Sequence, residues 1–306
     1  MIKNTAGQHV FVIIVNWNGK SHTLACLSSF EKINRKPVEL HTIVVDNGST
    51  DDSIDVIKKK YPDVIIIPAG KNLGFTGGNN LGISYALDKN ADFIWLLNND
   101  TVVDPDVLSF LSAFDDPGVG ACGSKIYFAP GREYHIDRYK KNQLGKVIWY
   151  AGGLIDWGNM LASHRGVDEV DAGQYDESCK TPFITGCSFI VRADVVKRVG
   201  NLDDRYYLYL EDLDWSLRIK EAGYKIMYWP KSILWHENAG SSGRPGNKTH
   251  EYYFTRNRLI LGFRYAPVRT KIALIREAIR FLVSGSSVRQ KAVLDAFFGR
   301  FGKQYE

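Results

Sequence analysis

The chain has 306 residues, of which 44% are hydrophobic and 24% charged, a composition typical of globular proteins. Its longest apolar runs fall well short of the ~20 residues that span a bilayer. The four cysteines lack the paired spacing of a metal site, and no export signal precedes the first apolar run. We therefore expect a cytoplasmic protein with reduced thiols and no membrane-spanning helix.

The net charge of +5 is concentrated at the C-terminal end of the chain. Residues 268–306 contain eight Lys or Arg and three Asp or Glu, so the rest of the chain is electrically balanced. A balanced main body argues against nucleic acid as a partner. The basic end predicts contact with an anionic surface.

The first two apolar runs, residues 10–15 and 41–45, predict strands that are buried on both faces of a sheet. Asn16 follows the first strand, and Asp46 stands at the end of the second. A carboxylate in that position can accept a hydrogen bond from the imide N–H of uracil or thymine; the alternative is an ordinary Asp-Asn-Gly turn. Neither strand is followed by the glycine pattern of a P-loop or of a dinucleotide-binding turn.

A glycine-rich segment, residues 70–80, follows the next predicted strand at 64–67. It contains four glycines and three asparagines, and its candidate ligand-binding residues are Asn72, Gly77 and Asn80. Glycine permits close approach of the backbone to a ligand. The helix that follows offers free N–H groups for phosphate oxygens. The segment therefore predicts a ligand cradle rather than a plain loop.

The central strand is predicted at residues 93–97, an apolar run that stops at Asn98, Asn99 and Asp100. Open α/β sheets bind their ligands at the carboxyl ends of the strands. Asp100 can offer an oxygen to Mg²⁺ or Mn²⁺, and the neighbouring amides can hold a sugar hydroxyl. The alternative is a polar turn ahead of the next helix.

Strands that alternate with helices at this spacing predict an α/β fold with a mostly parallel sheet and right-handed crossovers. Residues 1–128 would form the nucleotide-binding half. Residues 129–180 are rich in Gly and charge, and we expect loops and short hairpins that line an acceptor cleft. Residues 185–192 are strand-like and lead into a short helix at 193–199.

A second polar cluster follows at residues 206–218, where Glu211 and Asp212 fall in the first turn of a predicted helix. Acidic residues there also stabilise a helix by ~0.3–1 kcal/mol each. Asp214 and Arg218 are spaced for a surface ion pair. Asp212 has no such structural reason and is the candidate catalytic residue.

Short strands are predicted at 224–229 and 233–235, and His236 ends the second as a structural hydrogen-bonding residue or a metal ligand. Residues 240–246 have the composition of a mobile lid. On the helix that follows, Arg256 is a candidate phosphate binder, because its guanidinium fork suits oxyanions; the alternative is an ordinary surface cation.

The C-terminal end carries apolar residues at helical spacing in 272–283 and 293–301, with basic residues between them. Basic amphipathic helices lie well on anionic bilayers, which predicts a peripheral position at the inner face of the plasma membrane. The same pattern could pack on the main domain or on a second subunit.

In combination, these segments resemble the family 2 inverting glycosyltransferases of the GT-A fold, especially their bacterial rhamnosyltransferase-like branch. The matching segments are, in chain order, residues 15–19, 45–51, 72–80, 97–100, 211–214 and His236. The resemblance implies a catalytic domain over 1–248, with its acceptor half at 129–248, and a basic helical extension over 249–306.

The resemblance also implies roles for individual residues. Asp46 would meet the nucleobase, with Asn16 and Asn72 near the nucleoside. Asp100 would bind a divalent metal as the last residue of an Asp-x-Asp-type motif, with His236 as a second ligand.

The resemblance makes Asp212 the catalytic base. Because Asp212 lies at a helix start, we expect it to stay ionised near neutral pH and to be a modest base. Asn98 departs from the motif, since it stands where the first Asp is expected. This departure keeps a ribose contact but removes one negative charge from the metal site.

The leading hypothesis is a metal-dependent inverting transferase that moves a sugar, with rhamnose as the candidate, from a dTDP or UDP donor. Its acceptor would be a hydroxyl of a cell-surface or lipid-linked glycan. The alternatives are a catalytically silent nucleotide-sugar-binding module that docks at membranes, and a sugar nucleotidyltransferase. The last should carry an early basic triphosphate loop, which residues 16–21 match poorly.

Overall fold

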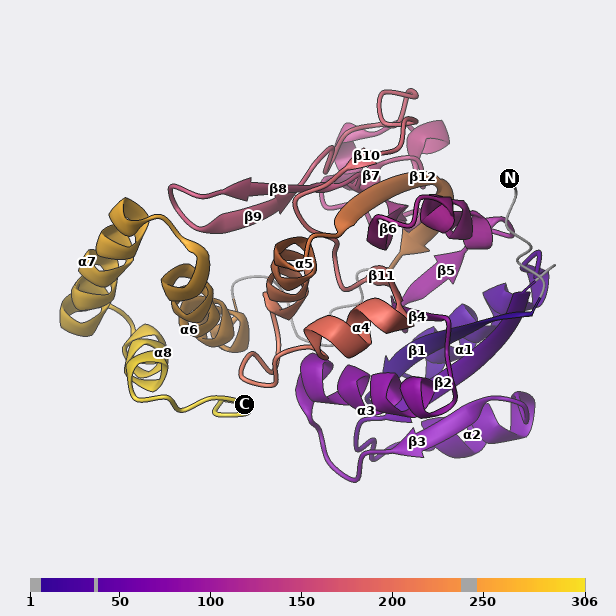
Figure 1. Cartoon of the computed structure of the whole chain (residues 1–306), viewed down its shortest axis with the longest axis horizontal. Helices are drawn as coiled ribbons and strands as arrows, with labels where there is room; N and C mark the ends of the chain where they lie inside the picture. The colour runs from indigo at the N-terminus through magenta and orange to yellow at the C-terminus, as the bar shows by residue number, and fades with distance from the viewer. Residues whose placement is uncertain (1–6, 36–37, 238–246, 306) are drawn as a thin grey trace.

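The computed structural model describes residues 7–35, 38–237 and 247–305. Its centre is a ten-stranded sheet in the order β10-β12-β6-β11-β4-β1-β2-β3, with β5 beside β12 and β7 beside β6. Helices flank this sheet, and a separate hairpin projects from it toward the C-terminal helices (Figure 1). The predicted α/β class is confirmed.

The N-terminal half of the sheet is parallel, as the sequence predicts. Its elements are β1 (Gln8–Asn16), α1 (Lys20–Ser29), η1 (Phe30–Lys32), β2 (Val38–Asp46), α2 (Ser53–Lys60), β3 (Ile65–Pro68), α3 (Gly74–Asp88) and β4 (Phe93–Asn98). On β1, Val10, Val12 and Ile14 join the core that includes α1 residues, whereas Phe11 and Ile13 join the core that includes α3 residues. Because both faces are covered, the strand must be continuously apolar.

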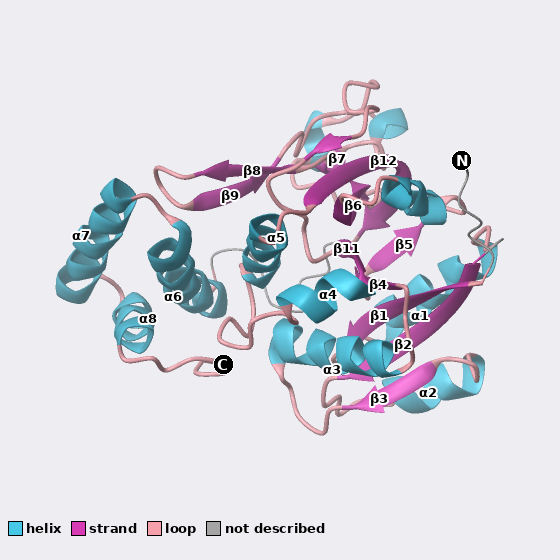
Figure 2. Ribbon diagram, viewed as in Figure 1, coloured by secondary structure: helices cyan, strands magenta, loops and turns pink. Residues whose placement is uncertain are grey.

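The second half of the sheet is mixed. Its strands and short 3-10 turns are β5 (Thr101–Val103), η2 (Val107–Asp115), β6 (Val119–Phe128), η3 (Ile136–Arg138), η4 (Lys141–Gln143), β7 (Ile148–Tyr150), β8 (Gly153–Asp156), β9 (Leu161–His164), β10 (Cys179–Lys180), β11 (Ser188–Arg192) and β12 (Lys225–His236). β11 lies antiparallel between β4 and β6, so parallel pairing resumes only between β6 and β12. The region predicted to form loops and short hairpins does so (Figure 2).

One strand replaces two predicted ones near residue 230. β12 runs continuously, and its register against β6 shifts between Trp229 and Ile233. Pro230 lies inside that shift. Proline cannot donate to a β-ladder and is tolerated at such bulges, so the sequence break is an irregularity within a single strand.

The remaining helices are α4 (Ala193–Val199), α5 (Glu211–Glu221), α6 (Lys248–Tyr265), α7 (Val268–Ser284) and α8 (Ser287–Phe297). Figure 1 shows α6, α7 and α8 gathered beside α5, away from the parallel strands. No helix within residues 7–35, 38–237 and 247–305 is long and apolar enough to cross a bilayer. The predicted lid at 240–246 lies outside the described residues, and the division into domains stays a prediction.

Candidate active site

The strand register gathers the predicted residues at one edge of the sheet. Asn16 pairs with Asp46, and Val15 pairs with Asn98, so β2, β1 and β4 end side by side. With neighbouring strands ~4.8 Å apart, Asp46 and Asn98 lie on the order of 10 Å from each other. This is the span of a nucleotide rather than of a single small ion.

Asp46 lies at the end of β2 with its carboxylate partly exposed. One oxygen, Oδ1, accepts the backbone N–H of Ser49 at 3.0 Å. Among the described residues no other hydrogen bond to this carboxylate is recorded, so Oδ2 is available to a ligand. This pattern fits a group that contacts a nucleobase better than it fits a turn residue whose hydrogen bonds are all made within the turn.

Asn47, for which the sequence predicts no role, bonds the end of β2 to the glycine-rich segment. Its side-chain N–H groups donate to Asn72 Oδ1 at 3.2 Å and to the Gly74 carbonyl at 3.0 Å. Its Oδ1 accepts the Leu73 N–H at 2.9 Å. The signal was present in the Asp-Asn-Gly sequence, because an asparagine at a strand end often bonds nearby backbone.

Three predicted donor-binding asparagines have structural partners. Asn16 is fully buried, and its amide bonds Ser49, Ser53 and Thr23. The Asn80 amide bonds both backbone groups of Leu202 and the Asp204 carboxylate, which ties α3 to the segment before α5. Asn72 Oδ1 accepts the Gly74 N–H at 2.8 Å and the Tyr207 hydroxyl at 3.3 Å.

The glycines of α3 serve packing as much as ligand approach. A Cβ on Gly74, whose φ is +72°, would lie 2.4 Å from the Tyr207 carbonyl oxygen, and a Cβ on Gly78 would lie 2.9 Å from Val15. A Cβ on Gly77 would meet only the Leu73 side chain, at 2.7 Å. The glycine-rich sequence therefore lets α3 lie close to β1 and to the turn before α5.

Asp100 and His236 form a mostly buried pair at the same sheet edge. Asp100 Oδ1 lies 3.1 Å from His236 Nε2, and their side chains are 11% and 6% exposed. Two ligand atoms bound at ~2.1 Å to one cation in neighbouring octahedral positions are about 3 Å apart, so the pair fits a shared divalent ion. His236 packs edge-on against Trp149, which fixes the plane of its ring.

Asp212 is held at the start of α5 by two backbone amides. Its Oδ2 accepts the Gly186 N–H at 2.8 Å, and its Oδ1 accepts the Leu213 N–H at 2.7 Å. Asn98 N–H donates to the Cys187 carbonyl, the residue after Gly186, so Asp212 is anchored beside the end of β4. The three predicted carboxylates therefore line one edge of the sheet.

The pKa of Asp212 differs in direction from the sequence expectation. Burial raises it above the usual value, against the lowering effect of the backbone hydrogen bonds. Burial and the charge of Asp212 also raise the pKa of the adjacent Glu211 well above its usual range. Asp212 is consequently a stronger base than a helix-start carboxylate alone would be.

The turn before Asp212 is strained and is held in place by α6. Tyr207, Tyr209 and Leu210 all have φ between +65° and +71°, which non-glycine residues adopt only where the surroundings impose it. The Asn257 amide donates to the carbonyls of Tyr206, Leu208 and Tyr209 at 2.7–3.0 Å. The Asn257 side chain thus bonds three carbonyls of the turn.

Arg256 bonds the same turn. Its hydrogen bonds do not support the predicted role as a phosphate binder. The guanidinium is fully buried and donates to Asn257 and to the carbonyls of Arg205, Tyr206 and Gly302. With its fork engaged by these acceptors, Arg256 cannot present it to a diphosphate without dismantling the turn. The alternative prediction, a surface cation, is also wrong.

The predicted ion pair of Asp214 and Arg218 exists, but it is buried rather than superficial. Asp214 is fully buried and accepts from Arg218 at 2.7 Å, Tyr265 at 3.0 Å and Arg264 at 3.3 Å. It therefore joins α5 to the end of α6.

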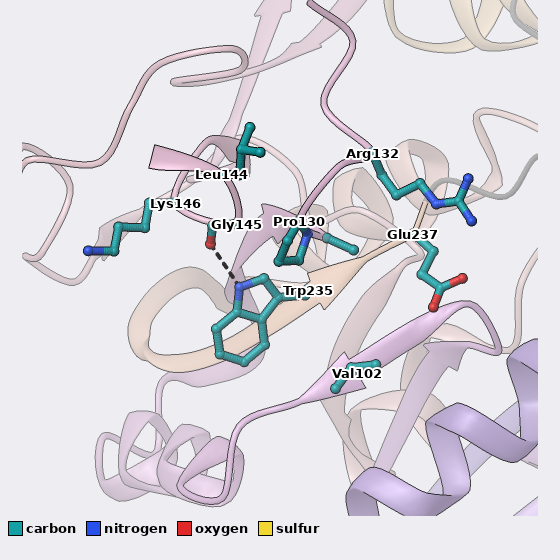
Figure 3. Close-up of a pocket in the computed structure, with 9 residues that line it drawn as sticks. Val102, Pro130, Arg132, Leu144, Gly145, Lys146, Trp235 and Glu237 are labelled. Atoms are coloured by element: carbon teal, nitrogen blue, oxygen red, sulfur yellow. Dashed lines mark hydrogen bonds between the residues drawn. The ribbon is translucent and has the colours of Figure 1, made fainter. Parts of the chain in front are cut away.

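A cavity of about 700 Å³ lies against the end of β12, where the Trp235 and Glu237 side chains line it (Figure 3). Side chains alternate along a strand, so Trp235 projects from the opposite face of β12 to His236. The cavity is linked to the Asp100–His236 pair through the backbone, because the Glu237 N–H donates to the Asp100 carbonyl. The Trp235 ring forms one wall and is fixed by an Nε1–H bond to the Gly145 carbonyl. Aromatic walls with a few charged groups are typical of small-molecule sites.

The segment 129–180 supplies much of this cavity, including Arg132 and Lys146. A neighbouring cavity of about 420 Å³ shares Trp235 and adds Tyr127. The segment predicted to line an acceptor cleft therefore lines a cavity, and the binding of an acceptor there stays a prediction.

Comparison with known proteins agrees with this architecture. The family model described as "Glycosyltransferase like family 2" matches residues 7–258. An N-acetylglucosaminyl-diphospho-decaprenol L-rhamnosyltransferase of Mycobacterium tuberculosis is 26% identical over 243 residues, 76% of this chain and 77% of that protein. The dTDP-rhamnosyl transferase RfbF of Shigella flexneri is 22% identical over 233 residues, 74% of this chain and 69% of that protein.

Solved structures show the same fold at low identity. A mannosyltransferase from Pyrobaculum calidifontis, in complex with GDP-Man and Mn²⁺, aligns over 96% of this chain and 76% of its own, with a TM-score of 0.55 and 16% identity. S. aureus TarS 1-349, in complex with UDP-GlcNAc, aligns over 94% and 79%, with a TM-score of 0.59 and 13% identity.

The fold and the family match together define a GT-A glycosyltransferase. The chain belongs to glycosyltransferase family 2, and it is similar to the rhamnosyltransferases of that family.

Proposed function

We propose that the protein transfers a deoxyhexose such as rhamnose from a dTDP- or UDP-linked donor to a hydroxyl of a lipid-linked or cell-surface glycan, with inversion at the anomeric carbon. The observation that carries the proposal is the placement of Asp46, the Asp100–His236 pair and Asp212 along one sheet edge. The similarity to bacterial rhamnosyltransferases supports the choice of sugar.

In this proposal each end of the donor meets a different strand end. Asp46 Oδ2 accepts the imide N–H of the base. Asp100 and His236 hold a divalent cation, Mn²⁺ or Mg²⁺, that acts as a Lewis acid on the leaving diphosphate. Asn98 supplies an amide where an Asp-x-Asp-type motif has its first carboxylate, so the site carries less negative charge toward the donor.

Asp212 accepts the proton of the acceptor hydroxyl. The amides of Gly186 and Leu213 hold its two oxygens in a fixed orientation, so the carboxylate need not reorganise as the proton arrives. The hydroxyl then attacks from the face opposite the leaving diphosphate, which inverts the anomeric centre in one step.

A donor screen tests the proposal. Nucleotide sugars are ranked by the shift in unfolding temperature with and without Mn²⁺, and hits are assayed for transfer to a polyprenyl-diphosphate-linked acceptor. Metal-dependent turnover of a dTDP- or UDP-deoxyhexose, with an inverted product linkage by NMR, is the expected result. Donor binding without transfer to any acceptor would contradict the transferase proposal and favour a catalytically silent nucleotide-sugar-binding module.

We infer further that the C-terminal helices rest on an anionic bilayer. α7 is apolar on two opposite sides, because Leu274 and Ala278 are buried while Ile272, Ile279 and Val283 are 47%, 56% and 80% exposed. One apolar side packs the helix onto the protein. The other is exposed, and Phe297 and Phe298 at the end of α8 are also exposed, with Phe297 resting partly on Phe263 of α6.

Charge on this surface favours an anionic bilayer over a second copy of the chain. Arg269, Arg276 and Arg280 are spaced to lie along one border of the exposed stripe. The acidic residues of these helices are neutralised locally, since Glu277 pairs with Arg258 and buried Asp295 pairs with Lys291. Two copies meeting through this stripe would bring like charges together.

Liposome sedimentation tests the bilayer contact. The wild type is expected to bind phosphatidylglycerol vesicles and not phosphatidylcholine vesicles, and an Ile272→Ser, Ile279→Ser double variant is expected to lose most binding. Leu154→Ser, at an exposed apolar residue of β8, is the matched control. Unchanged binding by the double variant, or a dimer that this variant dissociates, would refute the contact.

A further inference from the structure

The opposite edge of the sheet carries a cluster that the transferase reaction does not use. His9 lies at the start of β1, and Glu39 and His41 lie near the start of β2. Each strand runs from this edge to the active site, so His9 is seven residues, roughly 23 Å, from Asn16 at ~3.3 Å per residue. In Figure 1 both strands begin at the right, remote from α5 and α6.

The parallel register explains why the three side chains meet. His9 is paired with Glu39, and His41 is two residues further along β2. Side chains alternate along a strand, so Glu39 and His41 project from the same face as His9. Phe11 stacks on the His41 ring with centroids 4.4 Å apart, which holds that imidazole against the sheet.

The atoms are spaced as ligands of one metal ion. His9 Nδ1 lies 3.0 Å from His41 Nε2 and 3.5 Å from Glu39 Oε2, and the last distance, from His41 Nε2 to Glu39 Oε2, is 4.0 Å. Ligand atoms bound at ~2.0–2.1 Å around a four-coordinate ion are about 3.3 Å apart. Glu39 is 60% exposed and can turn inward by the small amount required.

We propose that His9, Glu39 and His41 form a binding site for a borderline transition-metal ion such as Zn²⁺, separate from the catalytic cation. Two imidazoles and a carboxylate suit Zn²⁺, Co²⁺, Ni²⁺ or Cu²⁺, whereas Mg²⁺ prefers oxygen ligands alone. The fourth position faces solvent, which leaves room for a water molecule. The ion cross-links β1 to β2 at the edge where both strands begin.

The electrostatics of the cluster are compatible with this role. Partial burial and the neighbouring His9 lower the pKa of His41. The two rings lie within hydrogen-bonding distance, with His9 Nδ1 3.0 Å from His41 Nε2. Among the described residues the ion-pair partners of Glu39 are His9 and His41, and neither Lys nor Arg is among them.

Titration of the tag-free protein with Co²⁺ and Zn²⁺, in the absence of any donor, tests the site. The wild type is expected to bind one equivalent with the visible absorption of four-coordinate Co²⁺, which Zn²⁺ abolishes, and to unfold at a higher temperature with Zn²⁺. His9→Gln and His41→Gln are each expected to weaken binding at least about tenfold, and Glu39→Gln to weaken it less.

Two controls separate this site from other ligands. His135→Gln removes a histidine that lies 3.8 Å from a single carboxylate, that of Asp168, and should bind Co²⁺ as the wild type does. Asp100→Asn should impair transfer and leave this binding intact. A wild type that binds no Co²⁺, or a folded His9→Gln, His41→Gln double variant that binds it with unchanged affinity, overturns the proposal.

Discussion

The two halves of the active site are built by opposite means. At the ends of β1 and β2 the polar side chains mainly bond each other and the nearby backbone, so Asn16, Asn47 and Asn72 shape loops that leave Asp46 partly exposed. The turn before Asp212 is bonded to Asn72 through Tyr207, and Asn257 and Arg256 on α6 hold it from the other side. The donor side is therefore held largely by its own loops, whereas the base depends on the C-terminal helices.

The largest expected effect comes from removing the base on the dependent side. Asp212→Asn keeps the shape of the side chain but cannot accept a proton, so turnover should fall about 10²–10⁴-fold with donor affinity little changed. Steady-state kinetics and donor titration measure the two quantities. Glu211→Gln is the matched control and should keep turnover within about tenfold of wild type, because Asp212 and not Glu211 is assigned the proton transfer. Equal losses in both variants would contradict the assignment.

Asn257→Leu should show most clearly that the two halves of the active site are held in different ways. It removes one donor from three carbonyls of the turn, of which that of Tyr206 keeps the Arg256 guanidinium, and an unsatisfied buried group costs about 1–3 kcal/mol. We expect a lower unfolding temperature and a strongly reduced kcat, with a much smaller change in donor binding, because most hydrogen bonds of the donor side lie within its own loops. Asn201→Leu, at a partly buried asparagine next to α4, is the control. Loss of donor binding in parallel with kcat would show that the halves are not independent.

The sequence predicts the first half of the fold far better than the machinery that holds the base. Continuous apolar runs such as 93–97 identify buried parallel strands, and strand ends identify Asp46 and Asp100, because both signals are local. Asn257 gives no local signal, since its partners lie about 50 residues earlier in the chain. Arg256 was visible as a cation, but nothing in its neighbourhood shows that it is buried.

The same limit explains the error in the pKa of Asp212. Position at a helix start is readable from the sequence and lowers a carboxyl pKa. Burial by Phe75, Gly186 and the residues around them is a tertiary effect and acts in the opposite direction. Where a local and a tertiary influence oppose each other, the sequence reports only the first.

The buried pair of acids gives a prediction about stability. The pKa of Glu211 in the folded protein lies well above its usual value of 4.5. The folded chain therefore binds this proton more tightly than the unfolded chain, and the stabilisation is lost as pH rises through the folded pKa. Glu211→Gln cannot ionise, so it should unfold at a higher temperature than wild type at neutral pH.

The difference should vanish below pH 4.5, the usual Glu value, where both chains are uncharged at this position. Between the two pKa values it grows by about 1.4 kcal/mol per pH unit. Thermal unfolding of both proteins across this range measures it. A Glu211→Gln gain that persists unchanged at acid pH would point to packing rather than ionisation.

The smallest expected effect on the reaction concerns Asn80, whose sequence context resembles a donor contact. In the structure its amide bonds Leu202 and Asp204, so Asn80→Ala should cost about 1–3 kcal/mol of stability while the donor Kd changes less than twofold.

Asp46→Ala should do the reverse, weakening donor binding about tenfold with little change in unfolding temperature, because only Ser49 is bonded to its carboxylate in the described chain. Calorimetric donor titration of the two variants compares a residue that shapes the loops with one that faces the ligand. A donor Kd that rises as much in Asn80→Ala as in Asp46→Ala would mean that the glycine-rich segment itself contacts the donor. Asn80 would then be a donor-binding residue and not only one that shapes the loops.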